Sequence, residues 1–162
     1  MNKTIADVDH PPVAPRLKLV RAPSPSLLRQ LSRLFDSVGM RSRRPAQMAR
    51  AIRNSDLAVA AYERDRLVGF GRLVSDHSYY GTLWDVAVER AHQGRGLGHA
   101  IVDRLLARAR RRQLTMIGLF TTARNDEFYE RFKFRKLSDI HPMTCSATAF
   151  RKVGHRPGRR RK

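Results

Sequence analysis

A glycine-rich segment, Gln93-Gly94-Arg95-Gly96-Leu97-Gly98, offers the clearest chemistry in this 162-residue chain. Glycine has no Cβ, so the backbone of such a segment can approach a ligand closely. The segment stands between an expected strand and an expected helix, and a helix start presents free N–H groups and the positive end of the helix dipole. Arg95 and His99 add positive charge at the rim. The combination predicts a binding site for an anion such as pyrophosphate.

Two better-known phosphate loops do not fit this segment. The dinucleotide-binding pattern requires a third glycine three residues after the second, and the P-loop requires Gly-Lys-Ser/Thr after four intervening residues. In both comparisons the required glycine is replaced by His99. A glycine-rich turn that only caps a helix is the alternative interpretation of the glycines taken alone.

A carboxylate, Asp85, stands in the middle of an apolar run that reads as a strand. Such a charge is costly to bury unless it is paired or functional. Strand alternation places Asp85 and Ala87 on one side and Trp84 and Val86 on the other. We therefore take Asp85 as a candidate general base, with a structural ion pair as the alternative.

The segment before this strand supplies further candidates for a substrate site. Asp76 and His77 are alternative bases, although a histidine at a loop tip is usually only solvated. Tyr79, Tyr80 and Trp84 are candidates for an aromatic substrate pocket, and the simpler interpretation is that they fill the core or the strand. We take Asp76, Tyr79, Tyr80 and Trp84 as the candidate substrate residues.

Hydrophobic periodicity predicts the elements that position these residues. The order of elements indicates an α/β (α+β) fold with a mostly antiparallel front half rather than a repeated βαβ array. Ser24-Pro25 is typical of a helix start, and Gly39 follows where that helix ends. The expected strands are 16–21, 57–62, 67–74, 81–88, a buried strand at 114–120, and two more around Phe134 and at 144–150; the expected helices are 25–38, 45–52, 97–111 and 125–132.

Composition limits the classes of function. The formal charge of +19 favours anionic partners such as nucleic acid, anionic lipid or a phosphorylated cofactor. Seven basic residues lie in 151–162, and the rest of the chain still carries about +12. We expect a flexible leader at 1–15, one domain at 16–150 and a disordered basic tail at 151–162.

The sequence also bears on compartment and metals. No apolar run approaches the roughly 20 residues needed to cross a bilayer. Asp7 and Asp9 argue against an acid-poor transit peptide. The single Cys145 cannot form an internal disulfide and has no paired base, and the six histidines show no metal-ligand spacing. We expect a cytoplasmic protein, or a plastid protein in a plant, without a metal site.

Two blocks resemble the GNAT (GCN5-related) N-acetyltransferase superfamily. Residues 93–98 match its Gln/Arg-x-x-Gly-x-Gly/Ala signature, placed after a strand and opening a long helix, and residues 125–134 resemble its Phe-Tyr-x-x-x-Gly-Phe segment. The likeness covers about residues 16–145. A narrower likeness links the chain to the plant-plastid and cyanobacterial branch, whose members include serotonin (arylalkylamine) N-acetyltransferases and protein acetyltransferases; the residues that carry it are 51–55, 67–72, 75–76 and 83–88.

The resemblance implies a fold, a cofactor and roles for individual residues. The fold is a central, mostly antiparallel mixed sheet of six to seven strands with about four helices, and the acetyl donor is acetyl-CoA. Tyr129 is the implied general acid for the leaving thiolate, and an amine attacks directly without an acyl-enzyme. The implied cofactor-binding residues are Val86, Ala87 and Val88 for the pantetheine arm, Gln93, Gly94, Arg95, Gly96, Leu97, Gly98 and His99 for the pyrophosphate, and Asn125 and Tyr129 beside them.

One residue departs from the family pattern. Lys133 stands where the family has glycine before the final phenylalanine. If that position is left-handed, a lysine there costs about 1 kcal/mol or requires a changed turn.

The acceptor is the open question of the sequence. Either an arylalkylamine such as serotonin or a protein lysine or N-terminal amine fits an acetyl-CoA-dependent N-acetyltransferase. The alternative is a non-catalytic CoA-binding protein, or a nucleic-acid- or ribosome-associated protein that uses the basic tail. A homodimer is expected only by analogy with the family.

Overall fold

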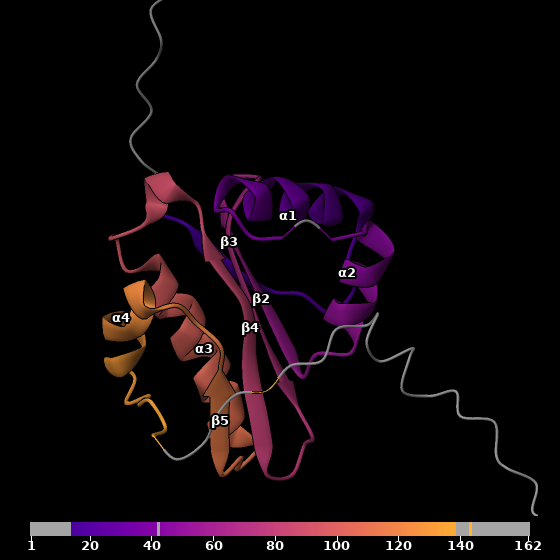
Figure 1. Ribbon diagram of the computed structural model, residues 1–162. Helices are drawn as coiled ribbons and strands as arrows, with labels where there is room; N and C mark the ends of the chain where they lie inside the picture. Colours follow the sequence, from indigo (N-terminus) through magenta and orange to yellow (C-terminus); the bar gives the residue numbers. More distant parts are fainter. Residues whose placement is uncertain (1–13, 42, 139–142, 144–162) are drawn as a thin grey trace, which may run out of the picture. The chain divides into compact units, whose positions relative to one another are not determined.

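One mixed sheet, formed between Arg16 and Leu119, organises the larger part of the molecule. The computed structural model describes residues 14–41, 43–138 and 143. The chain divides into two compact units, Met1–Phe120 and Thr121–Lys162, and each is described by itself. In the first unit the strands follow one another in the order β1-β2-β3-β4-β5 (Figure 1). The strands are β1 (Arg16–Leu19), β2 (Leu57–Glu63), β3 (Arg66–Ser75), β4 (Tyr80–Val88) and β5 (Met116–Leu119).

Helices cover both faces of this sheet (Figure 1). The helices α1 (Pro25–Ser37) and α2 (Pro45–Arg53) pack on one face, where the Phe35 ring meets Phe70 of β3 edge-on at 6.2 Å. The α1 helix starts as the sequence predicts, because the Ser24 hydroxyl accepts a hydrogen bond from the Leu27 N–H at 3.1 Å. The 15-residue helix α3 (Leu97–Arg111) lies on the opposite face.

Close packing of α3 explains two glycines of β3. A Cβ added at Gly69 or at Gly71 would lie 2.8 Å from a methyl group of Ile101, which is fully buried. Real Cβ atoms do not approach that closely, so the small residues let the helix settle onto the sheet. This contact holds α3, and with it the glycine-rich segment at its start, against the centre of the sheet.

A β-bulge interrupts the pairing of β3 with β4. Phe70 pairs with Ala87 and Arg72 pairs with Trp84, so Gly71 alone opposes both Asp85 and Val86. Asp85 accordingly has a positive φ of 55°. Residues paired across strands share a face, so Trp84 lies on the face of Arg72, which is also the face of Asp85. The sequence analysis placed Trp84 on the face opposite Asp85, and this is wrong. It also placed Val86 on that opposite face, and Val86 does lie there, on the α3 side near Gly71.

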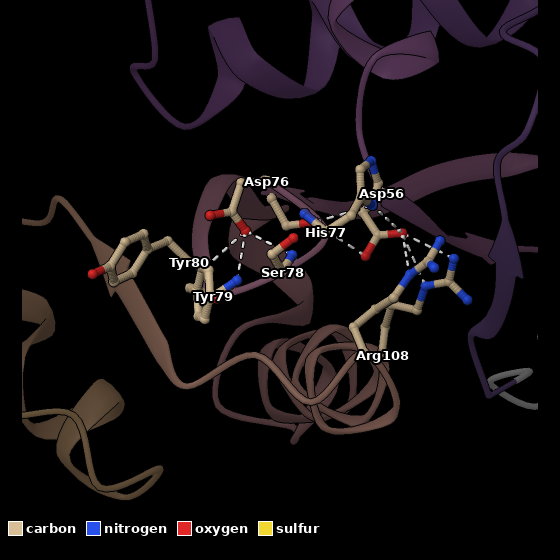
Figure 2. Close-up of polar contacts among 9 residues, drawn as sticks. Asp56, Asp76, His77, Ser78, Tyr79, Tyr80 and Arg108 are labelled. Carbon is tan, nitrogen blue, oxygen red and sulfur yellow. Dashed lines mark hydrogen bonds and ion pairs between the residues drawn. The ribbon is translucent and has the colours of Figure 1, made fainter.

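A buried carboxylate ties the end of α3 to the start of β2. The Asp56 side chain is 1% exposed, and its Oδ1 accepts from Arg108 Nε at 3.1 Å and Nη2 at 2.9 Å and from Arg112 Nε at 3.3 Å (Figure 2). Burial by itself would raise the pKa of Asp56, but the hydrogen bond and charge of Arg108, aided by Arg112, outweigh it and lower the pKa.

This lowered pKa predicts how stability depends on pH. A carboxyl group whose pKa is lower in the folded state stabilises the fold above its unfolded pKa of about 4, and that contribution is lost as the pH falls through the folded value. Asp56→Asn is expected to lower the free energy of unfolding at pH 7 by about 3 kcal/mol and to flatten its acid dependence. Denaturant unfolding from pH 7 to pH 3 measures both effects, with the exposed Asp65→Asn as control. Equal acid slopes in wild type and Asp56→Asn would contradict this assignment.

The described part of the second unit carries one short α-helix. After a 3-10 turn at Ala123–Asn125, helix α4 (Asp126–Glu130) holds Tyr129. Lys133 has a φ of 67°, so the turn keeps the left-handed conformation that glycine would favour. Its N–H donates to the Glu130 carbonyl at 2.8 Å, and the Phe134 N–H donates to the Tyr129 carbonyl at 3.3 Å. The usual turn geometry is therefore accommodated with lysine in place.

The structure confirms the predicted fold class and corrects parts of it. A mostly antiparallel mixed sheet and four α-helices are present in the described residues. The described part of the sheet has five strands instead of six to seven, and residues 133–138 form a turn and irregular backbone where a strand was expected around Phe134. The strand β5 is partly exposed rather than buried. The strand expected at 144–150 and the tail at 151–162 lie outside the described residues.

Two kinds of feature are absent from the described residues. Within them, no helix is both long and apolar enough to cross a membrane. The same part of the chain shows no cluster of three or more His, Cys, Asp or Glu side chains that could hold a metal ion.

Candidate functional site

The glycine-rich loop between β4 and α3 is open on its outer side. Gly94 and Gly96 have positive φ values of 73° and 80°, and a Cβ added at either would meet no atom within 4 Å. Gly96 is the N-cap of α3, no side chain caps the helix, and its first turn contains no acidic residue. The first N–H groups of a helix have no partner within the helix. The loop therefore combines open space, backbone donors and the positive end of the α3 dipole, which is the arrangement that binds an anion.

Gln93 anchors this loop to the end of β4. Its side-chain amide donates to the Val88 carbonyl at 2.8 Å. The sequence suggested Gln93 as a residue of the pyrophosphate site, and in the structure its side chain is directed at the strand. It supports the loop that presents the backbone donors.

The end of β4 has a backbone edge without a partner strand among the described residues. Pairing with β5 runs from Tyr80 to Leu83 and stops there, while pairing with β3 continues to Val88. Residues 84–88 thus have β3 on one side only. This edge contains Val86, Ala87 and Val88 and runs directly into the loop that Gln93 anchors, so the two form one continuous surface.

Asp85 is held by two arginines at the bulge. Its side chain is 6% exposed; Arg43 Nη1 lies 2.7 Å from Oδ1, and Arg72 Nε donates to Oδ2 at 2.5 Å. Each carboxylate oxygen of Asp85 therefore faces a guanidinium. This favours a structural ion pair over a general base as the role of Asp85. Arg43 precedes α2, so this pair also fastens the α1–α2 connection to the sheet.

We predict that Asp85 acts mainly on stability. Breaking a buried ion pair leaves two arginines without their anion, and Asp85→Asn should lower the free energy of unfolding by about 3 kcal/mol. Denaturant unfolding measures it, and Asp103→Asn, whose exposed side chain lies 3.6 Å from Arg110, should change it by less than about 0.5 kcal/mol. A fully stable Asp85→Asn variant without turnover would restore the general-base role.

An aromatic pair lies beside the bulge. The ring centroids of Trp84 and Phe120 are 5.7 Å apart, and the two residues are 39% and 63% exposed. They stand where β4 and β5 cease to pair. Phe120 was missed by the sequence analysis because its strand was taken as buried.

The remaining candidate substrate residues lie at the other end of β4. Asp76 Oδ1 accepts hydrogen bonds from the N–H groups of Ser78, Tyr79 and Tyr80 at 2.8–2.9 Å, as Figure 2 shows. These backbone hydrogen bonds, that of Ser78 first, lower the pKa of Asp76. Five residues of strand, about 16 Å, separate Tyr80 from Asp85. The structure thus brings Trp84 to the bulge and places Asp76, Tyr79 and Tyr80 in a turn that Asp76 stabilises.

Tyr129 and Asn125 belong to the second unit. The Tyr129 ring packs edge-on against Phe128 at 4.9 Å and Phe134 at 5.9 Å, and burial raises the pKa of its hydroxyl. Asn125 is the N-cap residue of α4, but its amide makes no capping bond and donates to Thr121 Oγ1 at 3.1 Å.

Comparison with known families accounts for this arrangement. The model of the acetyltransferase (GNAT) family matches residues 25–134, which include the bulge, the loop and Tyr129. The chain belongs to the GNAT acetyltransferase family.

The curated relatives that resemble this GNAT chain carry different names. It is 33% identical to a histone acetyltransferase TAP1 of Glycine max, over 64% of this chain and 50% of the relative. It is 32% identical to a chloroplastic serotonin N-acetyltransferase 2 of Oryza sativa subsp. japonica, over 64% and 54%. The chain spans only about half the length of these relatives.

A solved structure shares the fold and contains CoA. This GNAT chain matches a Mycobacterium tuberculosis protein, determined in complex with CoA, with a TM-score of 0.63 and 29% identity. The match covers 84% of this chain and 80% of the other.

Proposed function

We propose that the chain is an acetyl-CoA-dependent N-acetyltransferase that transfers acetyl directly to a primary amine. The observation that carries the proposal is the continuous surface formed by the open edge of β4, residues 84–88, and the anion-binding loop at the start of α3. Family membership and the CoA-containing structural neighbour support it.

The residues of this surface fit the parts of acetyl-CoA. The pyrophosphate suits the backbone of Gly94 to His99, because this loop is open, carries Arg95 and contains no acidic side chain. The pantetheine arm, which carries amide groups, suits the backbone edge of Val86 to Val88, which no strand pairs in the described residues and where the Val88 carbonyl is bonded to Gln93. Asn125, in the second unit, is proposed as an additional contact to that arm.

The proposed reaction joins the amine to the acetyl group and releases CoA as a thiol. A neutral amine attacks the thioester carbonyl, the C–N bond forms, the C–S bond breaks, the nitrogen gives up one proton to solvent, and the leaving thiolate takes one proton. A backbone N–H near Val88 polarises the carbonyl, and Tyr129 supplies the proton to the thiolate and regains one from solvent. A raised pKa keeps the Tyr129 hydroxyl protonated at neutral pH, which suits this role.

For the acceptor, an arylalkylamine such as serotonin is the first candidate. The exposed Trp84–Phe120 pair next to the bulge offers a surface for an aromatic ring. The positive charge of the chain disfavours a highly cationic peptide at long range. A protein lysine or N-terminal amine is the second candidate, supported by the relative named as a histone acetyltransferase.

A thiol-release assay with acetyl-CoA separates these acceptors. Tryptamine and serotonin should be used faster than a lysine peptide, and Trp84→Ala should raise the KM for the arylalkylamine about tenfold. The exposed apolar Leu19 of β1 provides the control Leu19→Ala. A preference for the peptide, unaffected by Trp84→Ala, would favour the lysine acceptor. No turnover with any amine, together with salt-sensitive RNA binding, would favour the non-catalytic alternative.

A further inference from the structure

A buried histidine lies at the base of the glycine-rich loop. His92 is 6% exposed and ends the 3-10 turn Arg90–His92 that leads into the loop. Its Nε2 hydrogen-bonds with Glu63 Oε1 at 3.1 Å, and its Nδ1 lies 3.0 Å from Glu89 Oε2. Arg66 in turn contacts both carboxylates, Glu63 at 3.3 Å and Glu89 at 2.5 Å.

Carboxylates lie against the His92 ring on both sides. Glu63 Oε1 is hydrogen-bonded with Nε2, and Glu89 Oε2 lies 3.0 Å from Nδ1 in a close contact rather than a hydrogen bond. Arg66 contacts both carboxylates and so links the two sides. These are the charged groups that the structure places against the ring from β2, β3 and the end of β4.

The cluster joins the loop to three strands. Glu63 ends β2, Arg66 begins β3, and Glu89 follows β4, where its N–H donates to the Val68 carbonyl at 2.9 Å. His92 is followed directly by Gln93, which is bound to Val88. His92 and Gln93 therefore fix the start of the loop. The glycines that follow have no side chains with which to anchor it.

We propose that His92 is a positioning residue for the pyrophosphate loop: held between Glu63 and Glu89, it fixes the loop in the conformation that presents Gly94 to His99. The proposal rests on the proposed function, because it assumes that this loop receives the pyrophosphate. A loop without this anchor must lose conformational freedom when it binds, so affinity for CoA falls. The acetyl-transfer step itself should not change.

His92→Gln tests the proposal in the full chain. A glutamine can contact one carboxylate but cannot lie against both as the imidazole ring does. We expect CoA to bind about tenfold more weakly by calorimetry, the KM for acetyl-CoA to rise by a similar factor, and kcat at saturation to stay within twofold. S-acetylpantetheine, which lacks the pyrophosphate, should be used equally well by His92→Gln and wild type. The surface variant Asp103→Asn is the control.

A second variant covers the case in which His92→Gln does not fold. Glu63→Gln removes one carboxylate from a half-exposed position and should weaken CoA binding about threefold, with kcat retained. CoA binding equal to wild type in the folded variants would overturn the role of His92, and so would equal losses for CoA and S-acetylpantetheine. Failure of the wild type to bind CoA would instead overturn the proposed function, and this inference with it.

Discussion

Gly96→Asp is expected to weaken CoA binding about 100-fold. The substitution places a carboxylate at the N-cap of α3, in the open space where the pyrophosphate is proposed to bind. A like charge at about 5 Å and an effective dielectric constant near 20 is worth roughly 3 kcal/mol, which corresponds to about two orders of magnitude in affinity. Calorimetric titration with CoA measures the loss.

Gly39 provides a matched control for this variant. It has a φ of 74°, and a Cβ there would also meet no atom within 4 Å, but it follows α1 rather than opening a helix. Gly39→Asp thus carries the same cost of a left-handed aspartate, about 1 kcal/mol of stability, without a charge at the loop. If both variants bind CoA equally, the loop is not the pyrophosphate site.

Tyr129→Phe is expected to lower kcat by about 100-fold while the Kd for CoA stays nearly unchanged. Positioned proton transfer by a side chain contributes two or more orders of magnitude, and phenylalanine keeps the ring packing against Phe128 and Phe134 while removing the proton. Steady-state kinetics and calorimetry on the same preparation measure the two quantities. The control is Tyr62→Phe, another partly buried tyrosine whose pKa is raised by burial. Wild-type turnover in Tyr129→Phe would remove this residue from the mechanism.

The pH profile gives Tyr129 an independent signature. Because burial raises the pKa of Tyr129, the hydroxyl remains protonated above the usual value of about 10. The group is active in its protonated form, so kcat should be lost only as the pH rises beyond that value. The residual activity of Tyr129→Phe should lack this alkaline limb.

Strongly periodic elements were predictable from the sequence, and their start signals were correct. Helix α3 spans Leu97–Arg111 as the apolar spacing indicates, and α1 begins after Ser24 because that cap and Pro25 act locally. The glycine-rich loop was also predictable, because its glycines, the strand before it and the helix after it are all neighbours in the sequence.

Features that depend on distant partners were not predictable in this way. At the bulge, one residue of β3 pairs opposite two residues of β4. The sequence of β4 alone does not show this, because the bulge depends on how β3 pairs with it. Arg43 and Arg72 come from a loop and another strand, so only the fold shows that Asp85 is doubly paired. The sequence analysis missed the turn role of Asp76, although an aspartate that accepts from N–H groups two to four residues later is a common turn signal.

The central claim, direct acetyl transfer from acetyl-CoA to a primary amine, is tested most directly by measuring both products together. The full chain is incubated with acetyl-CoA and tryptamine, and CoA and the acetylated amine are quantified by mass spectrometry. We predict equal amounts of the two products, in proportion to enzyme and time, and about 100-fold less of both with Gly96→Asp at subsaturating acetyl-CoA. No acetylated product from tryptamine, a lysine peptide or a peptide N-terminus, in a protein that binds CoA, would contradict the account.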